Sequence, residues 1–423
     1  MRLAIIMAAS AAIAYAANPA KAANFEDPPE EAPSLSLPST QVSGEGFHIQ
    51  DPVHSDGLMH HYVVESRFGT FSAYGRSALA IRLQEVSALA TIARTSDAQV
   101  VLNSVTRGIH EDVHSVKQVA THPVGVVLGI PKGISHLLGG YGAQAQEASQ
   151  QAKQALHTGD AKSKGGTKGS GDWLAKHYAT NYALRYLGLT AAERRWYAKL
   201  GVDPYTNNEV LRAAVKRLAK VDAAASFGMR FAPIGVPFAG ELNHALEAIY
   251  NEDPAVLRKR RHQALAGYGL TAAEVAQFEN HLLLSPTRQT LLVNAVESLA
   301  GVADRAELLR HASEVTTEEE MEVFLDSTRL LVQFHAHQPV TRIIGGVRVP
   351  TACLADGHLA VFGAFDAVYW TEDVVGYARA LREALAPENA VGLDVWLAGT
   401  VSPRARAEIE HLGWEVHDQS PTL

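Results

Sequence analysis

The stretch VGLDVWLAGTVSPRARAEIEHLGWEVHD, residues 391–418, contains three predicted elements in immediate succession. VGLDVWLAG is rich in large apolar and β-branched residues and is bounded by glycines, which favours a strand. SPRARAEIEHLG is typical of a helix, with Ser402 as N-cap and Gly413 as C-cap. WEVHD then predicts a last short strand. Strand, helix and strand in this order predict part of an α/β domain.

The same alternation extends toward the N-terminus. TRIIGGVRVPTACLA (341–355) and HLAVFG (358–363) are β-like, whereas TEDVVGYARALREAL (371–385) is helical with Thr371 as its cap. Residues 338–423 are therefore predicted to form a small α/β domain.

The preceding region, residues 172–337, has helical periodicity throughout and is predicted to be an all-helical domain. Thr190 with Glu193 and Thr271 with Glu274 form two predicted capping boxes. Further helix starts are predicted at Asn208, Asp253, Ser285 and Thr317.

Residues 47–157 are predicted to contain a hairpin followed by helices. β-Branched and aromatic residues in 58–74 give the hairpin, and apolar spacings of three and four mark helices over 79–92 and 102–120. TGDAKSKGGTKGSG, residues 158–171, is typical of a flexible linker. The predicted fold class is thus mainly α, with a short N-terminal β-hairpin and a C-terminal α/β domain.

The N-terminus indicates export. Residues 1–22 have the charged start, apolar run and small residues of a signal peptide, and 23–46, rich in Pro, Glu and Ser, are predicted to be a disordered leader. Cys353 is the only cysteine, so a lipid anchor at the cleavage site and an intramolecular disulfide are both excluded. We expect a periplasmic or secreted protein that is not a lipoprotein.

Charge argues against nucleic acid as a partner. The net charge is −8, and the basic run at 258–261 has no interleaved aromatic residues, so it is interpreted as a solvated helix face. The apolar, Gly- and Pro-punctuated segment 122–142 has two interpretations: a buried connection, or an interfacial segment that lies on a membrane surface.

One short motif indicates metal chemistry. His110, Glu111 and His114 have the order H-E-x-x-H, which on a helix places two imidazoles on one Zn²⁺ with the glutamate as general base. A third ligand would come from His122 or Glu147. This pattern predicts a zinc site with His110, His114 and His122 as metal ligands and Glu111 as the catalytic residue.

The surroundings of this motif favour a simpler interpretation. Gly108 disfavours a helix, Asp112 puts a carboxylate between the histidines, and the sequence before His110 offers one hairpin rather than the sheet under which such helices pack. A polar helix edge and a non-catalytic metal site remain alternatives.

The other histidines give no clear site. His60 and His61 are adjacent, and neighbours on a strand point to opposite faces; His54 lies nearby. His335 and His337 end a predicted helix and are interpreted as structural.

Three stretches carry a resemblance: HPVGVVLGIPKGI (122–134), YAKLGVDPYTNNEVL (197–211) and WLAGTVSPRARAEIEHLGWEVH (396–417). They are similar to a group of exported bacterial proteins with no known activity. The resemblance implies export and supplies no functional residues.

These observations predict an exported, non-enzymatic binding or scaffolding protein of the cell envelope. Its partner would be an envelope component, or the membrane surface contacted through 122–142. The alternatives are a zinc-dependent hydrolase acting through residues 110–114, and a small-molecule or haem carrier using clustered histidines without covalent attachment.

Overall fold

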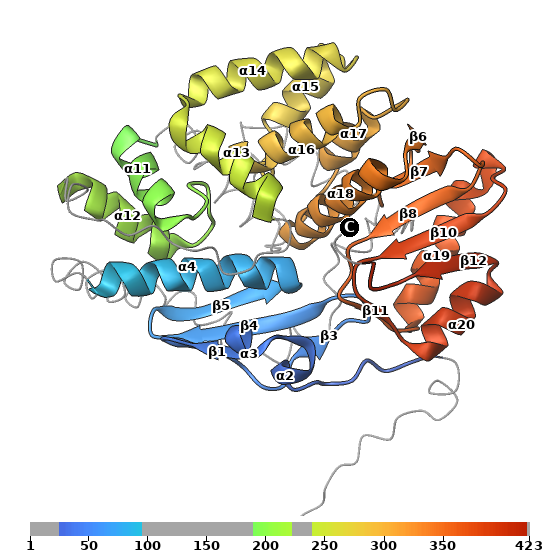
Figure 1. The fold of residues 1–423 in the computed structure, drawn as a ribbon, viewed down its shortest axis with the longest axis horizontal. Helices are drawn as coiled ribbons and strands as arrows, with labels where there is room; N and C mark the ends of the chain where they lie inside the picture. The colour runs from blue at the N-terminus through green and yellow to red at the C-terminus, as the bar shows by residue number, and fades with distance from the viewer. Residues whose placement is uncertain (1–24, 95–188, 222–238, 421–423) are drawn as a thin grey trace, which may run out of the picture.

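The computed structural model describes residues 25–94, 189–221 and 239–420. Two five-stranded sheets form the N-terminal and C-terminal parts, and helices lie between them in the chain (Figure 1). The prediction of a mainly α chain with only a short N-terminal hairpin is therefore wrong, because the described residues form a mixed α and β structure.

The N-terminal sheet is antiparallel and built around one long strand, β4 (His60–Ser66). β5 (Gly69–Tyr74) pairs along one edge of β4, whereas β3 (His54–Ser55) and β2 (Phe47–Ile49) pair with its other edge, and β1 (Ser43–Gly44) pairs with β2. The predicted hairpin is thus β4–β5, but it is only part of a larger sheet. β1 to β3 span two or three residues each, too few for the alternation that marks a strand in sequence.

The segment predicted as a disordered leader, 23–46, contains regular structure over its described part. α2 (Pro33–Ser36) and α3 (Ser39–Val42) are single turns that lead into β1. Both turns follow a residue with extended backbone angles, and α2 begins at a proline, which suits the first turn of a helix. The described part of this Pro-rich stretch thus includes two short helical turns.

Two glutamates attach this segment to the rest of the molecule. The Glu26 carboxylate accepts hydrogen bonds from the Trp370 main-chain N–H and the Ser402 hydroxyl. Glu31 exchanges two backbone hydrogen bonds with Val53. Residues near the start of the described chain are therefore held against the C-terminal sheet region.

α4 (Arg76–Arg94) packs on β4 and β5 (Figure 1). Leu79, Leu83, Val86 and Ile92 are fully buried and recur on one side of the helix, which is why the amphipathic pattern predicts it correctly. This face forms a core with residues of two later helices, including Trp196.

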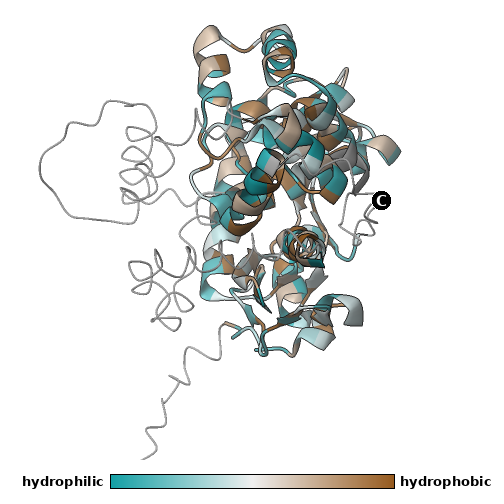
Figure 2. Cartoon of the chain, turned by 90° about the vertical axis from the view of Figure 1, so that its left-hand side faces the viewer, coloured by the Kyte–Doolittle hydropathy of each residue, from teal (hydrophilic) through white to brown (hydrophobic). Residues whose placement is uncertain are grey.

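Several of the described helices of the middle region begin at caps that the sequence shows. The capping boxes at Thr190 and Thr271 are confirmed, and each makes both reciprocal hydrogen bonds. The helices are α11 (Ala191–Leu200), α12 (Glu209–Val221), α13 (Ala239–Asn251), α14 (Pro254–Gly267), α15 (Ala272–Glu279), α16 (Pro286–Ser298), α17 (Glu307–Ala312) and α18 (Glu318–His337). Figure 2 shows hydrophilic and hydrophobic residues on the same helices, as expected for helices that pack on one side.

Packing divides these helices between two large cores. α11 and α12 share the core of the N-terminal sheet and α4, whereas side chains of α14 to α18 join the core of the C-terminal sheet. A small separate cluster, Tyr205, Ile249 and Leu257, lies between α13 and its neighbours. The described helices of this region therefore belong to more than one core.

The C-terminal sheet has the strand order β12-β10-β8-β7-β6. β8, β10 and β12 are parallel, and β6, β7 and β8 are antiparallel to one another in turn. Its elements are β6 (Val340–Ile343), β7 (Thr351–Leu354), β8 (Leu359–Gly363), α19 (Glu372–Leu385), η2 (Ala386–Glu388), β10 (Leu393–Leu397), α20 (Pro403–His411) and β12 (Trp414–His417), with the small pair β9 (Ala367–Val368) and β11 (Thr400–Val401) beside them.

The two faces of this sheet have different covers. Parallel strands joined by helices have right-handed crossovers, so α19 and α20 cover the same face. On the opposite face the α18 residue Phe334 packs against Phe362 and Trp396, with ring centroids 5.1 and 4.8 Å apart. Asp394, Glu415 and His417 share that second face by register.

Candidate ligand-binding site

The sequence-predicted zinc residues lie outside the described part of the chain. This holds for His110, Glu111, His114 and His122, and equally for the alternative ligand Glu147. The linker 158–171 and the apolar segment 122–142 also fall there. The predicted zinc site therefore stays a prediction that the structure does not test.

The adjacent histidines on β4 point to opposite faces, as predicted. His60 is buried, and its Nδ1 lies 3.3 Å from the Tyr62 hydroxyl and 3.6 Å from an Asp366 carboxylate oxygen. His61 is partly exposed and contacts Asp56 instead. They belong to two separate polar clusters and do not form one site.

A pocket of about 310 Å³ lies between α13, α16 and α18. Such a volume is at the lower end of the range for small-molecule sites. The lining residues are His244, Leu291, Leu292, Asn294, Ala295, Ser298, Leu325, Thr328, Arg329 and Val332.

Two helices supply most of the wall with the same spacing. α16 contributes residues 291, 292, 294, 295 and 298, and α18 contributes residues 325, 328, 329 and 332. Apart from residue 292, each set has the spacing i, i+3, i+4, i+7, so each forms one stripe along its helix. The side chains of these two facing stripes do not fill the space between α16 and α18, and the unfilled space is the pocket.

The pocket wall is mainly apolar, with a few polar groups. The Ser298 hydroxyl donates to the Asn294 carbonyl and the Thr328 hydroxyl to the Phe324 carbonyl, at 2.9 and 2.8 Å. Both hydroxyl protons are therefore committed to the main chain of their own helix. The hydroxyl oxygens can still accept hydrogen bonds, and the Asn294 amide can donate them.

Arg329 places a cation at the pocket, and Asp326 holds it there. Arg329 Nη1 donates to Asp326 Oδ1 at 2.7 Å, and the Arg329 side chain is 14% exposed. Burial raises the pKa of Asp326 to about 6, although the charge of Arg329 opposes that rise. The pair gives the pocket a polar wall beside its apolar one.

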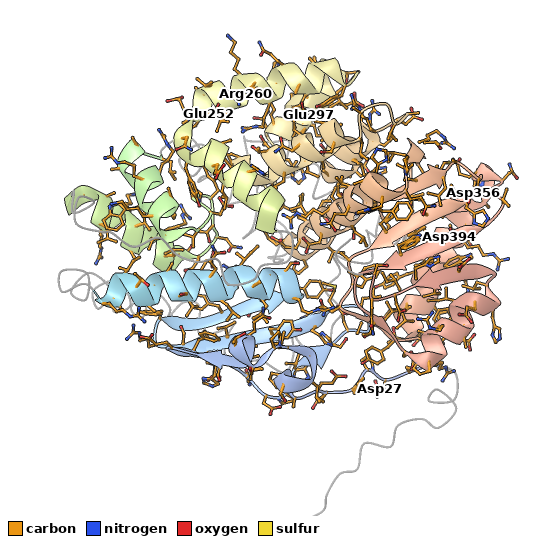
Figure 3. The ribbon with its side chains drawn as sticks, in the orientation of Figure 1. Asp27, Glu252, Arg260, Glu297, Asp356 and Asp394 are labelled. Atoms are coloured by element: carbon orange, nitrogen blue, oxygen red, sulfur yellow. The ribbon has the colours of Figure 1, made fainter. Side chains whose placement is uncertain are left out.

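α13 forms the open side. The His244 side chain is 84% exposed, and its Nδ1 lies 4.0 Å from a Glu247 carboxylate oxygen. Farther along, Glu252 pairs with Arg260 of α14 at 2.8 Å and ties these two helices together (Figure 3). α13 is therefore tied to α14 near its C-terminal end, whereas its His244 side chain at the pocket is exposed to solvent.

These residues belong to helices that the sequence predicts, but the sequence does not predict that they form a site. The sequence does contain a signal for this pocket. Polar residues interrupt the apolar stripes of the two helices at Asn294, Ser298, Thr328 and Arg329. A polar break in a stripe is also common on solvated helices, and only the packing of α16 against α18 shows that the two breaks meet.

A second group of buried ionisable residues lies at the start of α18. Glu320 has no exposed surface, and its Oε2 accepts a hydrogen bond from the Thr316 N–H at 2.8 Å. Arg348 Nη1 lies 3.8 Å from Glu320 Oε1, and burial raises the pKa of Glu320 to about 7. Nearby, burial lowers the pKa of His311 to about 4, so this ring is neutral. These groups tie α17, α18 and the strand connection together and enclose no described pocket.

Among the described helices, none has the length and apolar content needed to cross a membrane.

Comparisons with protein-family models, curated proteins and solved structures find no match for this chain. The case for function therefore depends on the geometry of the chain itself.

Proposed function

We propose that this chain is an exported, non-enzymatic binding protein of the bacterial cell envelope, and that it binds a small, mainly apolar molecule in the pocket between α13, α16 and α18. The observation that carries the proposal is the pair of facing stripes on α16 and α18 around a space of about 310 Å³. Export is supported by the signal-like residues 1–22.

The lining side chains favour a particular ligand chemistry. Leu291, Leu325 and Val332 suit an apolar body, because burying it removes apolar surface from water. Asn294 and Arg329 can donate hydrogen bonds to a polar end that accepts them. We therefore propose a ligand with a short hydrocarbon body and a carboxylate end.

The same side chains favour binding over catalysis. A nucleophilic hydroxyl needs a base within hydrogen-bond reach, but the hydroxyls of Ser298 and Thr328 donate to main-chain carbonyls. The pocket thus has groups that orient a ligand without an activated nucleophile among them.

Displacement of a fluorescent probe tests this function. We expect 1-anilinonaphthalene-8-sulfonate to bind the purified full chain at one site, and decanoate to displace it. Ala295→Phe, which fills the pocket, is expected to weaken decanoate binding at least tenfold, measured as the competition constant.

Ala273→Phe on the exposed face of α15 is the matched control, since it adds the same ring away from the pocket. Equal decanoate affinity in the wild type and Ala295→Phe, with the fold of both checked by circular dichroism, would show that the ligand binds elsewhere and would refute the proposed site.

A further inference from the structure

The exposed part of the C-terminal sheet carries three potential metal ligands close together. Asp394 lies on β10, and Glu415 and His417 lie on β12 (Figure 3 labels Asp394). One donor atom from each lies within 4.8 Å of the others. Parallel pairing places Asp394 opposite Glu415, and the two-residue period puts Glu415 and His417 on the same face.

Neighbouring side chains hold two of these groups in place. The His417 ring stacks on Trp396, with centroids 4.0 Å apart and planes 14° apart. His358 Nδ1 lies 3.2 Å from Asp394 Oδ1, within hydrogen-bond distance. A ligand carboxylate that is itself hydrogen-bonded is typical of metal sites, because the outer partner fixes its orientation.

Exposure leaves room for an ion and for water. The Asp394 side chain is 13% exposed and that of His417 29%, whereas that of Glu415 is 69% exposed. His417 Nε2 is 3.6 Å from Glu415 Oε1. Ligands about 2.0–2.2 Å from a zinc ion lie roughly 3–4 Å from one another, and the exposed Glu415 side chain is free to rotate by the small amount required.

We propose that Asp394, Glu415 and His417 bind a divalent transition-metal ion, with His358 as the hydrogen-bonding partner of Asp394. One imidazole and two carboxylates suit Zn²⁺ better than Ca²⁺ or Mg²⁺, which prefer oxygen ligands alone. Three protein ligands leave a position for water or for a group from a partner. Its ligands are other residues than those of the pocket and of the H-E-x-x-H motif, and the proposal does not depend on the proposed function.

Isothermal titration of the metal-stripped full chain with Zn²⁺ tests the site. We expect one equivalent of Zn²⁺ to be bound by these residues. Glu415→Gln and His417→Ala should each weaken its binding at least tenfold, and His358→Ala about tenfold through Asp394. His411→Ala is the control, because His411 is 78% exposed on the neighbouring α20.

The H-E-x-x-H motif requires a second control, His110→Ala combined with His114→Ala. Zinc binding that survives this double substitution and is lost on Glu415→Gln supports the proposal. The proposal is overturned if the wild type binds no zinc, or if Glu415→Gln and His417→Ala both retain every wild-type zinc equivalent. Unchanged melting temperatures of the metal-free variants exclude misfolding as the cause of any loss.

Discussion

Glu320 shows how one buried carboxylate couples the stability of this fold to pH. It lies in the first turn of α18 with no exposed surface, and its pKa is raised to about 7. Between the ordinary pKa of 4.5 and this value, the folded chain binds more protons at Glu320 than the unfolded chain. The contribution of Glu320 to stability therefore falls as pH rises through this window.

Glu320→Gln removes this titration while it keeps an amide oxygen to accept the Thr316 hydrogen bond. We expect the variant to gain on the order of 3 kcal/mol in unfolding free energy relative to the wild type between pH 4.5 and pH 7.5. Urea unfolding of both proteins at the two pH values measures the difference. His311, with its lowered pKa, shifts stability the opposite way, but it is present in both proteins and cancels. If the unfolding free energies of the two proteins changed equally with pH, the raised pKa of Glu320 would be contradicted.

At the scale of elements, the two capping boxes offer a matched comparison. Thr190 and Thr271 begin α11 and α15 with the same LTAAE sequence and the same reciprocal hydrogen bonds. We expect Thr190→Ala and Thr271→Ala each to cost about 1 kcal/mol of unfolding free energy, measured by urea denaturation.

The two glutamates of these boxes differ. Glu274 also accepts a hydrogen bond from Arg310 of α17 at 2.7 Å, and its pKa is lowered to about 2, first by the Thr271 backbone N–H and then by Arg310. Glu274→Gln should therefore destabilise the protein more than Glu193→Gln. Equal losses would mean that the contact with Arg310 adds nothing measurable.

Elements with local signals are the ones that the sequence predicts well. Helix caps at Ser285, Thr317, Thr371 and Ser402 are all present, because a cap depends on a few neighbouring residues. β1 to β3 depend instead on pairing within the sheet, β2 and β3 with β4 and β1 with β2, which no local pattern reveals. The sequence does not predict the pocket or the proposed metal ligands for the same reason. Each site joins residues of separate elements, and these residues come together only when the elements pack.

At the scale of the molecule, Asp366 connects the two sheets. Its carboxylate accepts hydrogen bonds from the His60 N–H at 3.0 Å and from the Arg76 N–H and Nε, both at 3.2 Å. Burial alone would raise the pKa of Asp366, but the hydrogen bonds from His60 and the charge of Arg76 outweigh it and lower the pKa. One side chain, in the connection between β8 and β9, thus joins the C-terminal region to β4 and to the start of α4.

Asp366→Asn should destabilise this connection, because an amide group would face donors that now meet a carboxylate. We expect a loss of roughly 2–3 kcal/mol at neutral pH, measured by urea unfolding. Since the pKa of Asp366 is lowered, its contribution is present above the ordinary value of 3.8 and is lost as pH falls below it. Asp27→Asn, an exposed substitution, is the control; a similar loss in both variants would refute a specific role for Asp366.

The contacts of Glu26 have a consequence for the order of folding. The Ser402 and Trp370 groups that Glu26 binds are synthesised more than 340 residues later. These contacts cannot form before residues 370 and 402 have been synthesised, and contacts of such long sequence separation form slowly. Docking of the Glu26 segment on the C-terminal region is therefore a late step of folding.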